Sequence, residues 1–298
     1  MNSPRIGIVL GAGGALGWAY HLGVVEGLRQ GLHLELAHAT RVVGTSAGAA
    51  IAASVLAGAS STEVLAAIDQ PLTPDEEDEM RDARGQLRQH PVRTLRPQAP
   101  AMVRKGGFTG LLGLIPAGVL PTMTLRRFPI DRFDSWPAGL WVPAVRIGDG
   151  EVVVFGRDRT DVTVRDALEA SSAVPGMFEP KDIDGSRFMD GAVASATHAD
   201  LLESDFDTVI VSSPMTRPPA PGKRRGPVRR RAQRQLDREV AVLRSMGTKV
   251  VVLTPDQAVM TAADGYPRSN PGAGAATVAA ASRQATRLIK EQLTARGR

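Results

Sequence analysis

The stretch RVVGTSAGAAIAASVLA, residues 41–57, joins a short apolar run to an alanine-rich run through Gly44-Thr45-Ser46-Ala47-Gly48. The first run is typical of a buried strand, and the second is typical of a closely packed helix. A sharp strand-to-helix turn brings backbone segments close together, and the glycines on both sides of the serine allow that approach. Ser46 is therefore predicted to be a nucleophile at a helix N-terminus, where the helix dipole favours developing negative charge. The alternative is a glycine-rich helix start that Ser46 merely caps.

The same order of strand, turn and helix occurs earlier in the chain. Residues 5–10 form an apolar run, a glycine-rich loop follows, and residues 15–30 carry apolar side chains spaced for one helix face, with Gly31 as the expected stop. Two such units predict an α/β fold, because alternating strands and helices build a parallel sheet with crossover helices. We expect a three-layer α/β/α architecture with a mostly parallel central sheet.

The rest of the 298-residue chain continues this pattern. Apolar runs at 140–147 and 151–155 flank Asp149-Gly150, which predicts a β-hairpin. Further strands are expected at 208–211 and 249–253, and helices at 164–171, 227–246 and 275–296. We expect a single α/β domain over residues 1–298.

Residues 72–135 depart from this alternation. The charged segment 75–89 predicts an exposed helix, and residues 91–129 hold six prolines among glycines and apolar side chains. An apolar, broken segment inserted between sheet strands is typical of a cap over a site. An ordinary irregular packing segment is the alternative.

The glycine-rich loop GAGGALG, residues 11–17, opens the first predicted helix. Its backbone N–H groups are free to bind a phosphate or an oxyanion. A dinucleotide fingerprint needs a glycine where this chain has Leu16, and the Gly-Lys-Ser/Thr of a Walker loop is absent from the segment. An oxyanion hole beside the serine turn is therefore the better interpretation. Its expected donors are Gly13 and Gly14, and the supporting positions are Gly11 and Gly17.

A serine nucleophile needs a base, and the residues leave two kinds open. Of five histidines, His198 alone lies late enough for a Ser–Asp–His order, whereas His21 falls inside the first predicted helix and is more typical of a structural histidine. A carboxylate is the other candidate. Asp-Gly pairs, each also typical of a turn, occur at Asp149, Asp184, Asp190 and Asp264. Asp190 differs because apolar residues flank it, and a partly desolvated carboxylate close to Ser46 accepts a proton more readily.

Composition restricts the chemistry and the expected location. The chain has no cysteine, which excludes disulfides, thiolate catalysis and cysteine-ligated metals. The N-terminus has no signal-peptide pattern, and the longest low-charge stretch, residues 47–60, is too short to span a membrane. We therefore expect a cytoplasmic protein.

The net charge of +5 is concentrated in residues 214–234, which are expected to form a basic, proline-rich loop. Eight Lys or Arg and no acid lie between Arg217 and Arg234. One interpretation is a solvated loop. The other is attraction to an anionic lipid surface, which would hold the protein peripherally at a membrane. Nucleic acid is not an expected partner, because no aromatic residue is interleaved for base stacking.

Together these motifs resemble the patatin-like phospholipase family. The resemblance rests on four ordered blocks, namely the loop at 11–17, the G-x-S-x-G motif at 44–48, the segment ASSAVPGMFEP at 170–180, and Asp190-Gly191-Ala192. It covers roughly residues 5–195 and selects Asp190 over the other Asp-Gly pairs. The supporting glycines of the second and fourth blocks are Gly44, Gly48 and Gly191.

The resemblance implies a sheet flanked by helices and a Ser46–Asp190 dyad without a histidine base. It also implies an oxyanion hole at Gly13 and Gly14, lipid acyl esters as substrates, and no metal or cofactor. The chain departs from the family at two positions. Leu16 stands where an Arg or Lys is frequent, and Ala12 replaces a common glycine. The loss of that cation is expected to alter headgroup preference or activity.

Two other functions remain open from the residues. An α/β-hydrolase esterase would use His198 as its base, although the nucleophile of that fold usually follows several more strands than precede Ser46. A non-catalytic lipid- or nucleotide-binding protein could keep the same fold. If the chain hydrolyses lipid esters, the apolar residues from Met102 to Leu125 are expected to help admit the acyl chain.

Overall fold

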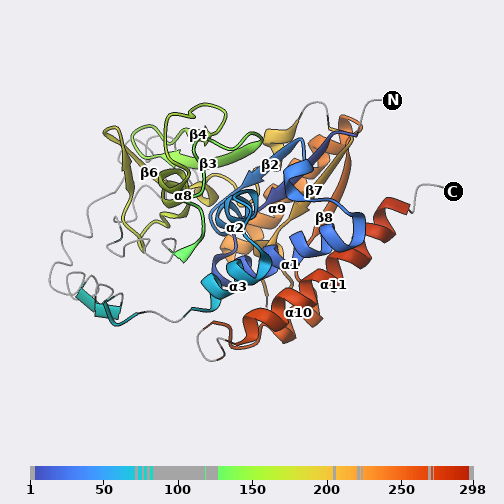
Figure 1. Cartoon of the computed structure of the whole chain (residues 1–298). Helices are drawn as coiled ribbons and strands as arrows, with labels where there is room; N and C mark the ends of the chain where they lie inside the picture. The colour runs from blue at the N-terminus through green and yellow to red at the C-terminus, as the bar shows by residue number, and fades with distance from the viewer. Residues whose placement is uncertain are drawn as a thin grey trace.

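The fold is a mixed α/β architecture built on an eight-stranded sheet (Figure 1). The computed structural model describes residues 4–70, 73–75, 77–78, 81–82, 118, 127–203, 206–219, 222, 224–267, 270 and 272–294. The strands run in the order β5-β6-β3-β2-β1-β7-β8, and β4 pairs with β3. The expected α/β class is confirmed.

Five neighbouring strands form the parallel part of the sheet. They are β3 (Leu140–Arg146), β2 (Arg41–Gly44), β1 (Ile6–Leu10), β7 (Thr208–Ser212) and β8 (Lys249–Leu253). Each adjacent pair among these strands is parallel, as crossover connections require. The carboxyl ends of β1, β2 and β7 therefore lie together, with Leu10 opposite both Gly44 and Ser212.

The remaining strands are antiparallel and lie on the β3 side. They are β4 (Val152–Phe155), β5 (Lys181–Ile183) and β6 (Ser186–Asp190). Strand β4 closes the predicted hairpin with β3, so that prediction is confirmed. Strand β6 pairs with the last residues of β3 and with β5. The β5–β6 hairpin was not expected from the sequence.

The helices follow the strands in crossover order. The α-helices that Figure 1 labels are α1 (Gly14–Leu32), α2 (Ala47–Leu56), α3 (Ser61–Asp69), α8 (Val164–Ser172), α9 (Pro227–Ser245), α10 (Gln257–Ala262) and α11 (Ala273–Thr294). Short 3-10 turns are η1 (Leu36–His38), η3 (Gly191–Val193), η4 (Ala199–Leu202) and η5 (Pro214–Thr216). The helices expected after β1, β2, β4, β7 and β8 are confirmed.

Alternation along the central strands divides the core into two layers. Ile8 and Leu10 of β1 belong to the cluster that contains buried residues of α1, α2, α3 and α11. Val9 between them belongs to the cluster that contains Leu236 and Leu243 of α9. Because successive side chains of a strand point to opposite faces, helices cover both faces of the sheet (Figure 1).

Helix α1 packs directly on α11 through a stripe of glycines. A Cβ at Gly23 would lie 2.4 Å from the Val278 carbonyl oxygen, and one at Gly31 would lie 3.0 Å from Thr286. Gly31 was expected to end the helix, but it is part of this close contact instead. The helix continues to Leu32 and ends at His33, whose φ of 52° is left-handed.

Two segment predictions have different outcomes. The loop expected over 214–234 is wrong for residues 214–216 and 227–234, which form η5 and the first turns of α9, because a proline at the first helical position suits a helix start. The cap expected over 72–135 and the acyl-admitting segment 102–125 lie largely outside the described residues, so both stay predictions.

None of the described helices meets the length and apolarity that crossing a bilayer demands.

Candidate active site

Ser46 stands at the turn between β2 and α2, in a strained backbone conformation. Its φ of 52° and ψ of −116° are unusual for a residue with a side chain. The glycines beside it are sterically required. A Cβ at Gly48 would lie 1.9 Å from the Leu10 carbonyl oxygen, and one at Gly44 would lie 2.6 Å from the Ala49 Cα. Packing of α2 against the end of β1 therefore enforces this turn.

The turn is attached to α8 and β3 by hydrogen bonds. The Ser46 backbone N–H donates to Ser171 Oγ at 3.0 Å, and the Ser171 hydroxyl donates to the Pro143 carbonyl at 2.8 Å. Ser171 is fully buried, and Ser46 is 9% exposed. Ser171 thus links the Ser46 turn to the strand that also pairs with β6. Sequence reasoning assigned Ser171 no role, although it lies in the 170–180 block.

Asp190 reaches the same place from the opposite direction. Strand β2 pairs with the first residues of β3, and the antiparallel β6 ends with Asp190 opposite Ala144. Thr45, which follows β2, and Gly191, which follows β6, therefore lie next to each other. A Cβ at Gly191 would lie 2.4 Å from the Pro143 oxygen and 3.2 Å from Thr45 Cγ2, so glycine is needed for this approach.

The Asp190 carboxyl is buried, with 3% of the residue exposed. Burial raises its pKa from 3.8 to about 6, against the opposing effects of the Ala192 N–H, which donates at 2.7 Å, and of a hydrogen bond with the Ser46 side chain. The structure thus brings the Ser46 hydroxyl and the Asp190 carboxyl into contact. A desolvated carboxylate that still ionises near neutral pH is a suitable proton acceptor.

The glycine-rich loop presents unpaired amides at the start of α1. Gly13 caps the helix and Gly14, with φ of 60°, is its first residue. Within the described part of the chain, no hydrogen bond is made by the backbone N–H groups of Gly13 to Leu16. A Cβ at Gly17 would lie 3.1 Å from the Ala47 Cβ, so this helix start adjoins the Ser46 turn. Free amides at a helix N-terminus attract anionic oxygens.

Strands and loops on both sides hold this loop in place. Gly11 N–H donates to the Ser212 carbonyl at 2.9 Å, and Ala12 N–H donates to the Ala196 carbonyl at 2.8 Å. Ala12 therefore ties the glycine-rich loop to the segment that follows Asp190. That contact uses the backbone only, so the alanine at this position leaves it intact.

Two buried histidines hold the carbonyls of glycines that begin these loops. His21 Nε2 lies 2.6 Å from the Gly11 oxygen, and His198 Nε2 lies 3.0 Å from the Gly191 oxygen. Burial lowers the pKa of His21 to about 4 and also lowers that of His198, so both are neutral at physiological pH. Among the hydrogen bonds of the described residues, neither ring bonds to Ser46 or Asp190. The structural role expected for His21 agrees with this geometry.

Glu239 of α9 is a buried carboxylate that sequence reasoning missed. It accepts hydrogen bonds from Ser195 Oγ at 2.6 Å, Thr197 Oγ1 at 2.5 Å and the Ala199 N–H at 3.0 Å. Burial raises its pKa. In the sequence it is one acid in a charged amphipathic helix, and nothing local distinguishes it from a surface residue. Its contacts fix the segment that follows Asp190.

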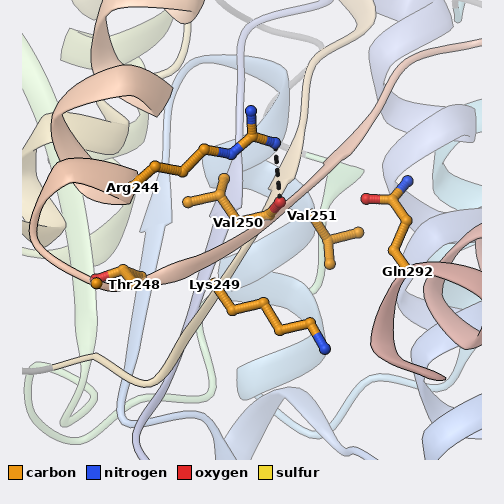
Figure 2. A pocket seen from close by; sticks show the side chains of 7 residues that line it. Arg244, Thr248, Lys249, Val250, Val251 and Gln292 are labelled. Atoms are coloured by element: carbon orange, nitrogen blue, oxygen red, sulfur yellow. Dashed lines mark hydrogen bonds between the residues drawn. The ribbon is translucent and has the colours of Figure 1, made fainter. Parts of the chain in front are cut away.

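A separate pocket of about 330 Å³ lies around the amino end of β8, away from the carboxyl strand ends where Ser46 lies (Figure 2). Figure 2 shows Lys249 and Gln292 of α11 among the lining side chains, and Arg244 donates to the Val250 carbonyl at 3.3 Å. Lys249 is the first residue of β8, so the pocket adjoins strand amino ends and lies far from the Ser46 turn. In the portion of the chain that the structure describes, no group of three acidic or histidine side chains could hold a metal ion.

Two solved structures resemble the chain over nearly its whole length. VipD from Legionella pneumophila is 13% identical, with a TM-score of 0.44 over 97% of this chain and 67% of VipD. The type III effector protein ExoU is 18% identical, with a TM-score of 0.45 over 98% of this chain. The chain spans 53% of the length of that ExoU chain.

A family comparison places the motifs described above in one known group. Residues 8–202, about two thirds of the chain, match the family described as patatin-like phospholipase. The matched range contains the glycine-rich loop, the Ser46 turn, the 170–180 block and Asp190. The chain belongs to the patatin-like phospholipase family.

Proposed function

We propose that the protein is a serine lipid-acyl hydrolase, a carboxylic ester hydrolase of the phospholipase A or esterase type. One observation carries the proposal. A strained serine at a helix start lies close enough to a buried carboxylate from a distant strand to lower the pKa of that carboxyl. Membership of the patatin-like phospholipase family supports lipid acyl esters as the substrate class. The proposed residues are Ser46 as nucleophile and Asp190 as base.

The proposed reaction has two halves. Asp190 accepts the hydroxyl proton as Ser46 Oγ attacks the ester carbonyl, and a tetrahedral oxyanion forms. When it collapses, the C–O bond to the alcohol breaks, and the leaving oxygen takes the proton from Asp190. Water then attacks the acyl-enzyme with the same carboxylate as base, and Ser46 is released together with the fatty acid. No external reactant besides water is needed.

The oxyanion is assigned to the amides of Gly13 and Gly14. These N–H groups have no partner among the described residues, and they begin a helix whose dipole favours negative charge. One such donor contributes about 3 kcal/mol to transition-state stabilisation. Leu16 lies in the same turn, so the cation that the family often has there is not required for the backbone donors.

The histidine-dependent alternative is disfavoured by the contacts of His198. Its Nε2 bonds to the Gly191 carbonyl, and its backbone N–H bonds to Ser195 Oγ at 3.0 Å. A triad would need this ring to bridge the serine and the aspartate. The non-catalytic alternative is disfavoured by the strain at Ser46, because such strain is concentrated at functional sites.

The test compares wild type with Ser46→Ala on p-nitrophenyl esters and phospholipid vesicles. We expect hydrolysis in the wild type, its loss in Ser46→Ala, and fluorophosphonate labelling of the wild type alone. Ser245→Ala, on the surface of α9, is the matched control and should keep full activity. A folded wild type that neither hydrolyses any ester nor takes up the probe would establish the non-catalytic alternative.

A further inference from the structure

Arginines gather where α9 begins. The described cations of this basic cluster are Arg217, Arg224, Arg225, Arg229, Arg230, Arg231 and Arg234. The sequence has no acidic residue between the first and the last of them. Val228 lies within the cluster and is 53% exposed. The cluster therefore combines positive charge with an exposed apolar side chain.

The cluster belongs to the same edge of the sheet as the candidate active site. Strand β7 ends at Ser212, whose carbonyl accepts the Gly11 N–H, and η5 follows directly. A Cβ at Gly13 would lie 3.0 Å from the Pro214 ring. The segment leading from η5 to α9 therefore starts beside the loop that holds the proposed oxyanion donors.

Two arginines of the cluster donate hydrogen bonds to backbone carbonyls of η5. Arg225 donates to the Thr216 carbonyl at 3.0 Å, and Arg217 donates to the Pro214 carbonyl at 3.2 Å. Further along α9, Gln235 Nε2 donates to the Ala194 carbonyl at 2.7 Å. These bonds fix the start of α9 relative to the segment that follows Asp190.

Four charges of the cluster, three on exposed side chains and one on the half-buried Arg229, are not balanced locally. Arg224, Arg229, Arg230 and Arg234 form no ion pair with any described residue. Burial, and the charge of Arg229, lower the pKa of Arg217 to about 10. Like charges held together raise the free energy of the protein unless external anions approach them.

We propose that the basic cluster is a docking surface for an anionic phospholipid bilayer, which it holds against the edge of the sheet where Ser46 lies. This inference rests on the proposed hydrolase function for its purpose, but the binding itself does not require catalysis. Exposed arginines attract anionic headgroups, and Val228 offers an apolar side chain to the interface. Nucleic acid is disfavoured, because no aromatic residue lies between Arg217 and Arg238 for base stacking.

The test uses the full chain carrying Ser46→Ala, so that vesicles stay intact. Flotation compares vesicles of pure phosphatidylcholine with vesicles that contain 30 mol % phosphatidylglycerol. Each basic residue contributes about a fivefold increase in partitioning onto an anionic surface. We expect Arg229→Gln/Arg230→Gln/Arg234→Gln to weaken binding to the anionic vesicles about 100-fold. High salt should weaken the parent protein in the same way.

The matched control is Arg187→Gln/Arg283→Gln/Arg287→Gln, which removes the same charge from exposed positions outside the cluster. It should bind anionic vesicles within a few-fold of the parent. Equal binding to both vesicle types, or equal losses in the two triple variants, would overturn the proposal. So would a cluster variant that loses binding to a single-stranded oligonucleotide but keeps its affinity for vesicles.

Failure of docking and failure of catalysis are separable. With an active Ser46, the cluster variant should hydrolyse soluble p-nitrophenyl butyrate at the wild-type rate and lose activity only on anionic vesicles. Vesicle binding without any ester hydrolysis would leave docking intact and reject the hydrolase. Hydrolysis of the soluble ester together with unchanged vesicle binding by the cluster variant would reject docking alone.

Discussion

The two halves of the sheet contribute to the candidate site by different means. In the parallel half, Ser46 and the amides of Gly13 and Gly14 stand where helices begin after β2 and β1, so backbone geometry positions them. In the antiparallel half, Asp190 is the last residue of β6, and strand pairing and burial position it. We therefore expect the parallel half to be sensitive to shape and the antiparallel half to be sensitive to charge.

Asp190→Asn tests the charge dependence of the antiparallel half and should have the largest effect. The amide keeps the size of the side chain but cannot accept the Ser46 proton, so kcat/KM should fall about 1,000-fold. The variant should fold, because removing a buried carboxylate removes its desolvation cost. Ester hydrolysis and thermal unfolding measure the two expectations. Wild-type activity in this variant would mean that Asp190 is not the base.

Gly48→Ala tests the shape dependence of the parallel half. The new methyl would lie 1.9 Å from the Leu10 carbonyl oxygen, and backbone cannot move aside cheaply. We expect a loss of about 3 kcal/mol or more in the free energy of unfolding, measured by urea denaturation. Gly148→Ala, in the turn between β3 and β4, is the control, because nothing lies within 4 Å of its added Cβ. Equal stability of the two variants would contradict the comparison.

The pH dependence follows from the raised pKa of Asp190, about 6. Below pH 6 the carboxyl holds a proton and cannot take one from Ser46, so kcat/KM should fall tenfold per pH unit. Stability has the opposite sign. The folded state binds this proton more tightly than the unfolded chain, so the contribution of Asp190 to the free energy of unfolding should rise by about 2 kcal/mol from pH 7 to pH 4.

Asp190→Asn supplies the reference for both pH effects. Its residual activity should not change between pH 7 and pH 5, and the stability difference between wild type and variant isolates the Asp190 contribution from that of other titrating groups. A wild-type rate that stays constant down to pH 4 would place the base elsewhere.

Substitution of the two buried histidines should have the smallest effect. His21→Leu removes hydrogen bonds to the Gly11 carbonyl and to Ser212 Oγ in the parallel half, and His198→Leu removes one to the Gly191 carbonyl in the antiparallel half. Each should lower kcat about 10-fold with little change in KM, because a loop near the reacting atoms loosens. His21→Gln keeps a donor at a similar position and should recover part of the loss. A complete loss in His198→Leu alone would revive the histidine-base alternative.

Sequence patterns predicted the parallel half well because its signals are local. Apolar runs, glycines and helical periodicity within about 50 residues predict the β1–α1 and β2–α2 units. The antiparallel half was predicted less completely. The β5–β6 hairpin has a two-residue turn at Asp184 and Gly185, both with positive φ. Its strands are short and mostly polar, so they lack the apolar pattern that marks a strand in a sequence.

The site shows the same division. Spacing singled out Ser46 and the glycines as candidates, whereas Asp190 was selected by the apolar residues beside it together with the family resemblance. Contacts between distant segments were not predictable. The bonds of Ser171 to Pro143 and of Glu239 to the 195–199 segment depend on how elements pack after the chain folds. A single sequence does not encode those partners by spacing.

The left-handed backbone at Ser46 lowers the stability of the fold at the residue that carries the proposed nucleophile. A side chain in this conformation costs roughly 1–3 kcal/mol, which glycine would not incur. We expect Ser46→Gly to unfold at a higher temperature than either the wild type or Ser46→Ala, although it has no nucleophile. Ser46→Gly would then be inactive and more stable than the wild type, which makes it the preferred form for crystallising a complex with an uncleaved lipid.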